Sequence, residues 1–438
     1  MRNINDASVP HHGVSTSPRL PAAAACLLAA LIVGGAGCER QRESAPAPTG
    51  SAATTRAADT AGAAFQNSPS ATPGDCRVET DLGALESYFR LGARLAKGHD
   101  VSEEDFRRLS ELPAYARLFA AMSPQFLNPG ILQNVTRYAF AAENAKAPGS
   151  SGRHGREPKR QDLKDTLAWS RDRAADIQAF AQAFASERAA CRAVERLAGY
   201  MDPSRLPDTL RVAFLIAGPD LRWLRDGVVI DGGLALAAGA EQLPRLLAAQ
   251  MYRALAPPVV PLPHHAGHGE AAVAAACEML RYEGVVGWLE GYPAMRFDSS
   301  HPLLGKRNAQ QARWASYAQV LITDMDKMLA GLFADRTLLD EHGSGIDDLL
   351  RGNGGYAPLG FAMAALIATR LGEDRLRAAS SDAAAFFRAF QEAAASEGGG
   401  RALPDQPWLF LGSVPALQPF SEQVFPELAR LLARGAGR

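Results

Sequence analysis

Two short apolar runs in the middle of the chain constrain its fold most strongly. "TLRVAFLIAG" (209–218) and "GVVIDGG" (227–233) are rich in β-branched residues and bounded by Gly, Pro and Asp, so they predict neighbouring strands of a small sheet. No internal repeat recurs at a fixed period, which argues against a solenoid. Apolar residues at three- and four-residue spacing predict helices over most of 81–203, 240–256, 270–291 and 305–435. We therefore expect an α+β fold, predominantly helical, with a small sheet in the middle of the chain.

The N-terminal 38 residues have the pattern of a secretory signal. Arg2 and Arg19 precede the apolar run "PAAAACLLAALIVGGAGC", which ends in small residues before Cys38. "GAGC" (35–38) resembles the lipobox of bacterial lipoproteins, although Gly35 stands where that motif usually has leucine. We expect a signal peptide over 1–37, a lipid on Cys38, and a membrane-anchored protein of the bacterial cell envelope that faces the periplasm or the exterior. An uncleaved anchor or a cut elsewhere are the alternatives.

Residues 38–75 are rich in Ala, Ser, Thr and Pro without an apolar period, so we expect a flexible tether after the lipidated cysteine. A net charge of -1 over 438 residues gives no basis for a nucleic-acid partner. Beyond the tether the chain holds Cys76, Cys191 and Cys277, which allow at most one internal bridge. Either Cys76 pairs with Cys191 or all three thiols are reduced.

The segment "LLAAQMYRAL" (246–255) is the helix whose polar face raises the question of function. Ala249 and Arg253 lie four residues apart and therefore project from the same face, one turn apart. The buried stripe of the helix consists of Leu243, Leu246, Leu247, Met251 and Leu255.

The order of strand, strand, this helix and a second helix containing "YEGVVGWLEGYP" (282–293) resembles the zinc peptidases of the zincin type. It is similar in particular to the gluzincin-like zinc-dependent peptidases, a domain of unknown function, found in bacterial secreted and lipoprotein chains. "ARLAKGHDVSEEDFRRLSELPAYARL" (93–118) and "GGYAPLGFAMAALIATRLGEDRL" (354–376) resemble the family's helical parts, and the resemblance covers most of 80–395. It implies a helical part over 76–204, a zincin-like core over 205–300 and a second helical part over 301–438.

The resemblance also implies where a zinc site would lie. In that family the first helix carries HExxH, in which two His bind zinc and the Glu acts as general base, and the second helix supplies a Glu ligand. The match places Glu283 at that last position. It places HExxH on Ala249-Gln250-Met251-Tyr252-Arg253.

These residues cannot perform the family's chemistry. Alanine has no donor atom, glutamine is not a base, and a guanidinium cannot lose its proton to bind a cation. No His or Cys occurs in 240–256, so a shift of register does not help. We expect no cofactor, an inactive site, and a residual cleft that binds a peptide or protein. Arg253 is predicted to pair with Glu283, a cation of the protein in place of the metal.

Other residues leave alternatives open. His264, His265 and His268, together with Glu283, could hold zinc and give an active hydrolase, although Gly267 and Gly269 interrupt the run. Glu283 and Glu290 share one face of the second helix, and a carboxylate pair suits a glycosidase, but nothing else in the chain supports that interpretation.

Tyr356, in "RGNGGYAPLGF", matches a family position that could face the cleft and stabilise an oxyanion, and packing at a helix entry is its simpler explanation. A helical scaffold lipoprotein without catalytic ancestry is the remaining alternative. It predicts no mixed or antiparallel sheet beside the 243–255 helix.

Overall fold

The computed structural model describes residues 76–140, 158–186, 189–218, 221–224, 227–256, 268–291, 296–311, 314–352, 355–396 and 417–435. The predicted signal peptide, Cys38 and the tether lie outside these residues. Within them, no helix is both long enough and apolar enough to cross a membrane.

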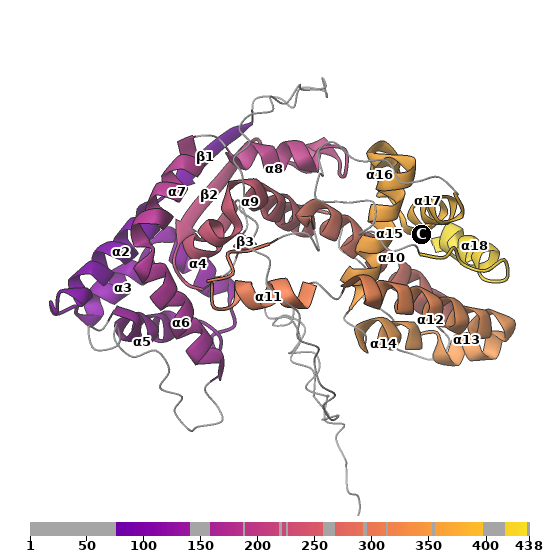
Figure 1. The fold of residues 1–438 in the computed structure, drawn as a ribbon, viewed down its shortest axis with the longest axis horizontal. Coiled ribbons are helices and arrows are strands. Elements are labelled where there is room, and N and C mark those ends of the chain that lie inside the picture. The colour runs from indigo at the N-terminus through magenta and orange to yellow at the C-terminus, as the bar shows by residue number, and fades with distance from the viewer. Residues whose placement is uncertain are drawn as a thin grey trace, which may run out of the picture. The chain divides into compact units, whose positions relative to one another are not determined.

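A four-stranded mixed sheet is built from strands of the middle of the chain and one strand from its beginning (Figure 1). Its order is β1-β2-β4-β3, with β1 and β4 parallel to β2 and β3 antiparallel to β4. The predicted strands are β2 and β4, and they are neighbours as expected. The bounds are Arg77–Asp81 for β1, Thr209–Leu215 for β2, Leu221–Leu224 for β3 and Gly227–Asp231 for β4.

The remaining described elements are mainly helices, so the predicted α+β class with a small central sheet is confirmed. The helices before β2 are α2 (Gly83–Ala96), α3 (Glu103–Glu111), α4 (Pro113–Ala121), α5 (Pro129–Phe140), α6 (Pro158–Asp172), α7 (Ala174–Ser186) and α8 (Ala189–Leu197). Those after α10 are α11 (Leu304–Gln311), α12 (Trp314–Ala334), α13 (Arg336–His342), α14 (Gly345–Gly352), α15 (Tyr356–Leu371), α16 (Glu373–Ala379), α17 (Ala383–Ala395) and α18 (Phe425–Gly435).

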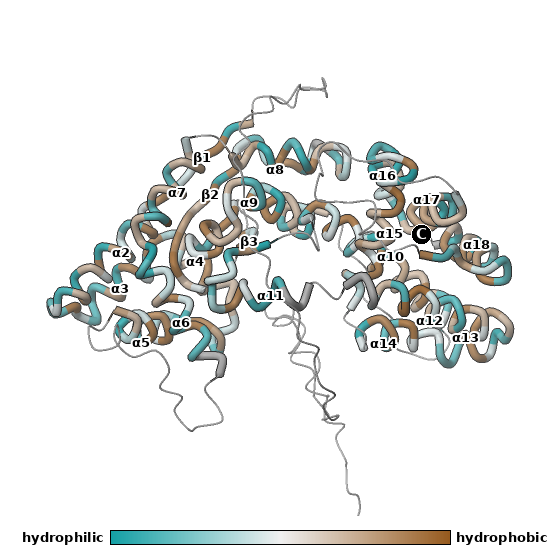
Figure 2. The backbone as a smooth tube through the Cα atoms, in the orientation of Figure 1, coloured by the Kyte–Doolittle hydropathy of each residue, from teal (hydrophilic) through white to brown (hydrophobic). Residues whose placement is uncertain are grey.

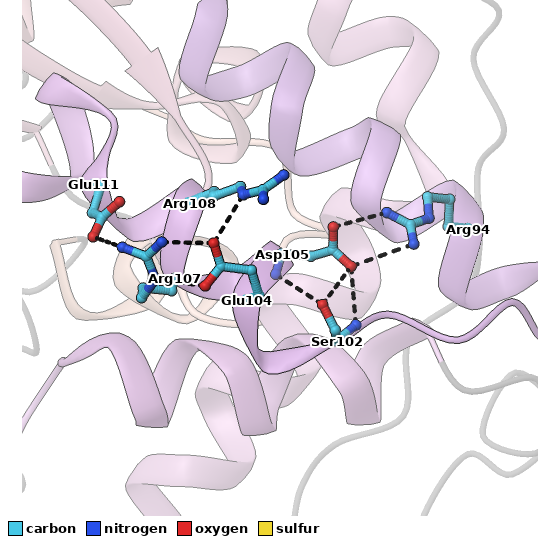
Figure 3. A network of polar contacts seen from close by, with 7 residues as sticks. All are labelled: Arg94, Ser102, Glu104, Asp105, Arg107, Arg108 and Glu111. Carbon is cyan, nitrogen blue, oxygen red and sulfur yellow. Dashed lines mark hydrogen bonds and ion pairs between the residues drawn. The ribbon is translucent and has the colours of Figure 1, made fainter.

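The segment "VSEEDF" (101–106) forms a capping box at the N-terminus of α3. The Ser102 hydroxyl accepts from the Asp105 amide at 3.1 Å, and the Asp105 carboxylate accepts from the Ser102 amide at 3.0 Å. Arg94 of α2 donates to the same carboxylate at 3.1 Å and so ties the two helices (Figure 3). Arg107 bridges Glu104 and Glu111 farther along α3.

The two helices that matter for the site follow the sheet directly. α9 (Gly232–Leu255) is kinked at Gly239, whose φ of 75° is a left-handed conformation that favours glycine, so its second half starts where the 240–256 helix was predicted. Asp231 caps α9 by accepting from the Leu234 amide at 2.9 Å, and it also accepts from the Ala217 amide at 2.9 Å. α10 (Gly269–Glu290) ends at Gly291 in a left-handed cap.

α10 packs on α15 at unusually short range, because glycines face each other. A Cβ at Gly360 would come within 2.5 Å of the Leu280 carbonyl oxygen, and one at Gly284 within 2.6 Å of the Gly360 carbonyl oxygen. Glycine is required at both positions because the two helix backbones are in contact there and leave no room for a Cβ. The contact fixes the position of α10, which carries Glu283.

Nearly all of the buried hydrophobic residues form one cluster that runs from Ala84 to Leu432. Figure 2 shows hydrophobic residues recurring along the helices in all parts of the described chain. The cluster crosses the predicted boundaries near residues 204 and 300, and the division into three parts stays a prediction. A disulfide joins Cys76 to Cys191 of α8, while Cys277 is a buried free thiol. Of the two possibilities for the cysteines, the paired one holds.

Candidate functional site

Arg253 of α9 and Glu283 of α10 face each other between two packed helices. A terminal guanidinium nitrogen (Nη2) of Arg253 lies 3.7 Å from Glu283 Oε2 and 3.8 Å from Glu290 Oε2. The Arg253 and Glu283 side chains are only 23% and 15% exposed. The ion pair predicted from the sequence is therefore present, and it is largely removed from water.

Burial and charge oppose each other in this cluster. Burial raises the pKa of Glu283, and the nearby Arg253 guanidinium partly offsets that rise. Burial alone would lower the pKa of Arg253, but Glu283 and Glu290 together raise it above its ordinary value. Glu290 is also held by Arg307, whose guanidinium donates to its other oxygen at 2.7 Å. From the sequence, Glu290 was considered only as the partner of Glu283 in a carboxylate pair, and the structure places it in the same ion-pair cluster.

A shallow pocket of about 280 Å³ opens beside the ion pair. Gln250, Arg253 and Ala254 of α9 form one side. The other side is formed by Arg222, Trp223 and Leu224 of β3, with Ala121 at the end of α4. The pocket thus lies between the degenerate helix and the antiparallel strand of the sheet. A scaffold without catalytic ancestry predicts no mixed sheet beside this helix, so the arrangement counts against that alternative.

Over residues 107–398, about two thirds of the chain, the sequence matches the family described as "Putative zinc dependent peptidase (DUF5700)". The chain belongs to this zinc-dependent peptidase family. The match confirms the predicted resemblance and agrees with a zincin-like α+β fold. No curated protein and no solved structure matches the chain.

The donor set at the position expected for zinc in this peptidase family does not fit the metal. Ala249 is buried and has no donor atom, and Gln250 offers a neutral amide. Arg253 places a positive charge next to Glu283, where it would repel a cation. In the part of the chain that the structure describes, no three His, Cys, Asp or Glu side chains are grouped so that they could hold a metal ion.

The alternative zinc ligands are not brought together as far as the structure describes them. His268 precedes the first residue of α10 and Glu283 lies on the same helix, about four turns and about 22 Å farther along. One ion cannot bridge that distance. His264 and His265 lie outside the described residues.

Tyr356 has a structural environment. Its hydroxyl donates to the Asp347 carboxylate at 2.5 Å, and Arg351 donates to the same oxygen at 2.6 Å. Burial, helped by Asp347, raises the pKa of Tyr356 far above its ordinary value. Tyr356 is 7% exposed and does not line the pocket. This placement agrees with the packing explanation for Tyr356 better than with a role in the cleft.

Two residues that sequence reasoning missed hold α9 against α10. The Tyr282 hydroxyl donates to the Arg253 carbonyl oxygen at 3.1 Å, and Arg281 donates to the Tyr252 hydroxyl at 2.9 Å. The two residues directly before Glu283 thus also reach α9, in addition to the contact of Glu283 with Arg253. The signal in the sequence was an arginine in the middle of a predicted helix, directly before a Tyr-Glu pair. An arginine that the structure buries needs a partner, which is how Arg281 comes to reach α9.

Proposed function

We propose that this chain is a catalytically inactive member of its peptidase family that binds a peptide or an extended protein segment without cleaving it. The observation that carries the proposal is the Arg253 guanidinium, which faces Glu283 where the family resemblance expects a zinc ligand. Gln250 cannot act as a general base at the position of the catalytic glutamate. The pocket beside Gln250 and Arg253 supports binding as the activity that remains.

The test is to measure metal and cleavage on the same preparation. The full chain, purified in detergent, is assayed for zinc by atomic absorption and incubated with a peptide library that is read by mass spectrometry. We expect no stoichiometric zinc and no cleaved peptide. One equivalent of zinc together with chelator-sensitive cleavage would overturn the proposal.

A reciprocal experiment tests the register on which the proposal rests. Ala249→His, Gln250→Glu and Arg253→His together place two imidazoles one helical turn apart on α9, the second of them at the position that contacts Glu283. We expect this triple variant to bind zinc, and we expect Glu283→Gln in the same background to weaken zinc binding at least tenfold. A folded triple variant without zinc affinity would contradict the alignment of Arg253 with the second histidine.

We also propose that the chain is a lipoprotein of the bacterial cell envelope, held at a membrane by a lipid on Cys38 and facing the periplasm or the exterior. The apolar run before "GAGC" and the Ala/Ser/Thr/Pro-rich segment after it support this proposal. The test is incorporation of labelled palmitate in a bacterial host, with Cys38→Ser as the control. Equal labelling of the two proteins would contradict lipidation at Cys38.

A further inference from the structure

We propose that the pocket beside Arg253 binds a carboxylate group of a peptide ligand, and that the Arg253 guanidinium is the group that recognises it. This inference rests on the proposed function, because it names the ligand chemistry of the same peptide-binding site.

The first argument is that the guanidinium keeps donors to offer. Arginine has five N–H donors. The contacts of the Arg253 side chain to Glu283 and Glu290 are ion pairs at 3.7 and 3.8 Å, beyond hydrogen-bond distance. Its Nε is buried and has no partner among the described residues. The two ion pairs hold the Arg253 side chain in place, but they do not use its N–H groups in hydrogen bonds.

Two other arginines near the site, Arg281 and Arg307, use their guanidinium groups in direct hydrogen bonds. Arg281 is buried and donates to Tyr252 at 2.9 Å, to the Ser380 carbonyl oxygen at 2.6 Å and to Glu278. Arg307 donates directly to Glu290 at 2.7 Å. Arg253 differs from both, since it lines a pocket and makes no such bond. The terminal nitrogens of Arg253, at 3.7 and 3.8 Å from the two carboxylates, are therefore left to donate to a ligand that enters the pocket.

The second argument is the charge around the pocket. Two arginines, Arg222 and Arg253, line the pocket, and no Asp or Glu is among the described residues that line it. Arg307 donates to Glu290 and so offsets part of the negative charge next to Arg253. A carboxylate is the anion whose two oxygens match the planar guanidinium.

The remaining lining fits the rest of a peptide. The Gln250 side chain makes no hydrogen bond to a described residue, so its amide can donate to a ligand oxygen. Trp223, Leu224 and Ala254 supply apolar surface for a neighbouring side chain. A volume of about 280 Å³ is small for a binding pocket, so it suits the end of a peptide or one acidic side chain better than a long segment. A C-terminal carboxylate and an Asp or Glu side chain therefore share the required chemistry.

Four short probes separate the two sources of the carboxylate. They are acetyl-Ala-Ala-Leu with a free C-terminus, the same peptide as C-terminal amide, acetyl-Ala-Asp-Ala amide and acetyl-Ala-Asn-Ala amide. Each is titrated into the full chain in detergent by calorimetry. We expect at least one carboxylate probe to bind tenfold or more tightly than its neutral partner. The pair that shows the difference identifies the source.

Three variants test the role of the guanidinium. The pair Arg253→Met with Glu283→Gln removes one charge of each sign, so it should fold and yet lose the carboxylate preference. Arg253→Lys keeps the charge but loses the planar fork, and we expect it to bind the carboxylate probe about tenfold more weakly. Arg90→Met, at an exposed position of α2, should bind like the wild type.

The outcomes distinguish this inference from the proposed function. Equal affinity for a carboxylate probe and its neutral partner would overturn the inference while leaving peptide binding in place. Retention of the preference in the Arg253→Met and Glu283→Gln pair would also overturn it, as would failure of both carboxylate probes to bind. Zinc-dependent cleavage, in contrast, would overturn the proposed function itself.

Discussion

Replacing Arg253 with Met removes the positive charge that faces Glu283 and Glu290, while a side chain of similar length still fills the space. We expect the substitution to destabilise the folded chain because the carboxylate of Glu283, only 15% exposed, is left without a compensating charge. The carboxylate of Glu290 is destabilised less, because Arg307 still donates to it at 2.7 Å. If Arg253 has taken the electrostatic place of a metal ion, its loss must act through Glu283.

The separations give the size of the effect. At 3.7 and 3.8 Å, Coulomb's law with an effective dielectric constant of about 20 gives about 4 kcal/mol for each ion pair. Removing one partner of a buried pair typically costs about 3 to 5 kcal/mol. Because the Arg253 side chain is 23% exposed, we place the expected loss near the lower end, at about 3 kcal/mol at pH 8.

The pH dependence has a definite sign. Burial already raises the folded-state pKa of Glu283 above its unfolded value, and removal of Arg253 raises it further. A carboxyl group with a raised folded pKa lowers stability as the pH rises from the unfolded pKa through the folded pKa. The destabilisation should therefore be small at acidic pH, below the raised pKa of Glu283, where the carboxyl group is protonated, and largest at pH 8.

Urea unfolding of the full chain, followed by circular dichroism at pH 5 and pH 8, measures both effects. Adding Glu283→Gln to Arg253→Met should restore most of the lost free energy of unfolding at pH 8. Arg90→Met, an exposed control, should change that free energy by less than about 0.5 kcal/mol. A loss that is equal at the two pH values, or that Glu283→Gln does not restore, would refute the electrostatic explanation.

Three further substitutions test the frame around the site, each by urea unfolding. Asp231→Ala removes the cap of α9 and leaves the Ala217 amide without its acceptor, so we expect a loss of about 3 kcal/mol. Unchanged stability would mean that water replaces these bonds. Gly360→Ala forces α10 and α15 apart and should cost about 3 kcal/mol, whereas Gly331→Ala, with open space around it on α12, should gain up to about 1 kcal/mol. Equal effects would refute the close contact. Tyr356→Phe leaves a buried Asp347 oxygen with one donor fewer and should cost about 1 to 2 kcal/mol without changing peptide binding. Altered peptide binding would instead place Tyr356 in the cleft.

The fold could be predicted where each element carries its own signal. β2 and β4 are almost wholly buried runs of apolar residues, and the helices around them show a clear three- to four-residue period. β1 ("RVETD") alternates between exposed and half-buried residues, so it lacks such a run. It becomes a strand because it pairs with β2, far away in sequence, and the sequence carries no local sign of that pairing.

The site could be predicted in part for a related reason. The resemblance to the zinc peptidase family placed Arg253 and Glu283 at facing positions, and helical spacing fixed which face of each helix they occupy. The contributions of Arg307 and of Arg222 come from elements whose placement depends on tertiary packing. The alternative zinc site fails for a geometric reason: His268 precedes α10 and Glu283 lies on it about four turns later, so the length of the helix keeps them apart.

The Cys76–Cys191 disulfide has a mechanical consequence. Tension on the chain before Cys76, as we propose for a protein anchored at Cys38, reaches Cys76, which is bonded to Cys191 of α8. The covalent bond passes that load to α8, which packs on α9, so it bypasses the hydrogen bonds of β1 to β2. A short parallel strand is a weak point under load, because it can be peeled or sheared from its neighbour. If the chain is anchored as proposed, the bond passes the pull to the helices next to the pocket, and β1 stays in register.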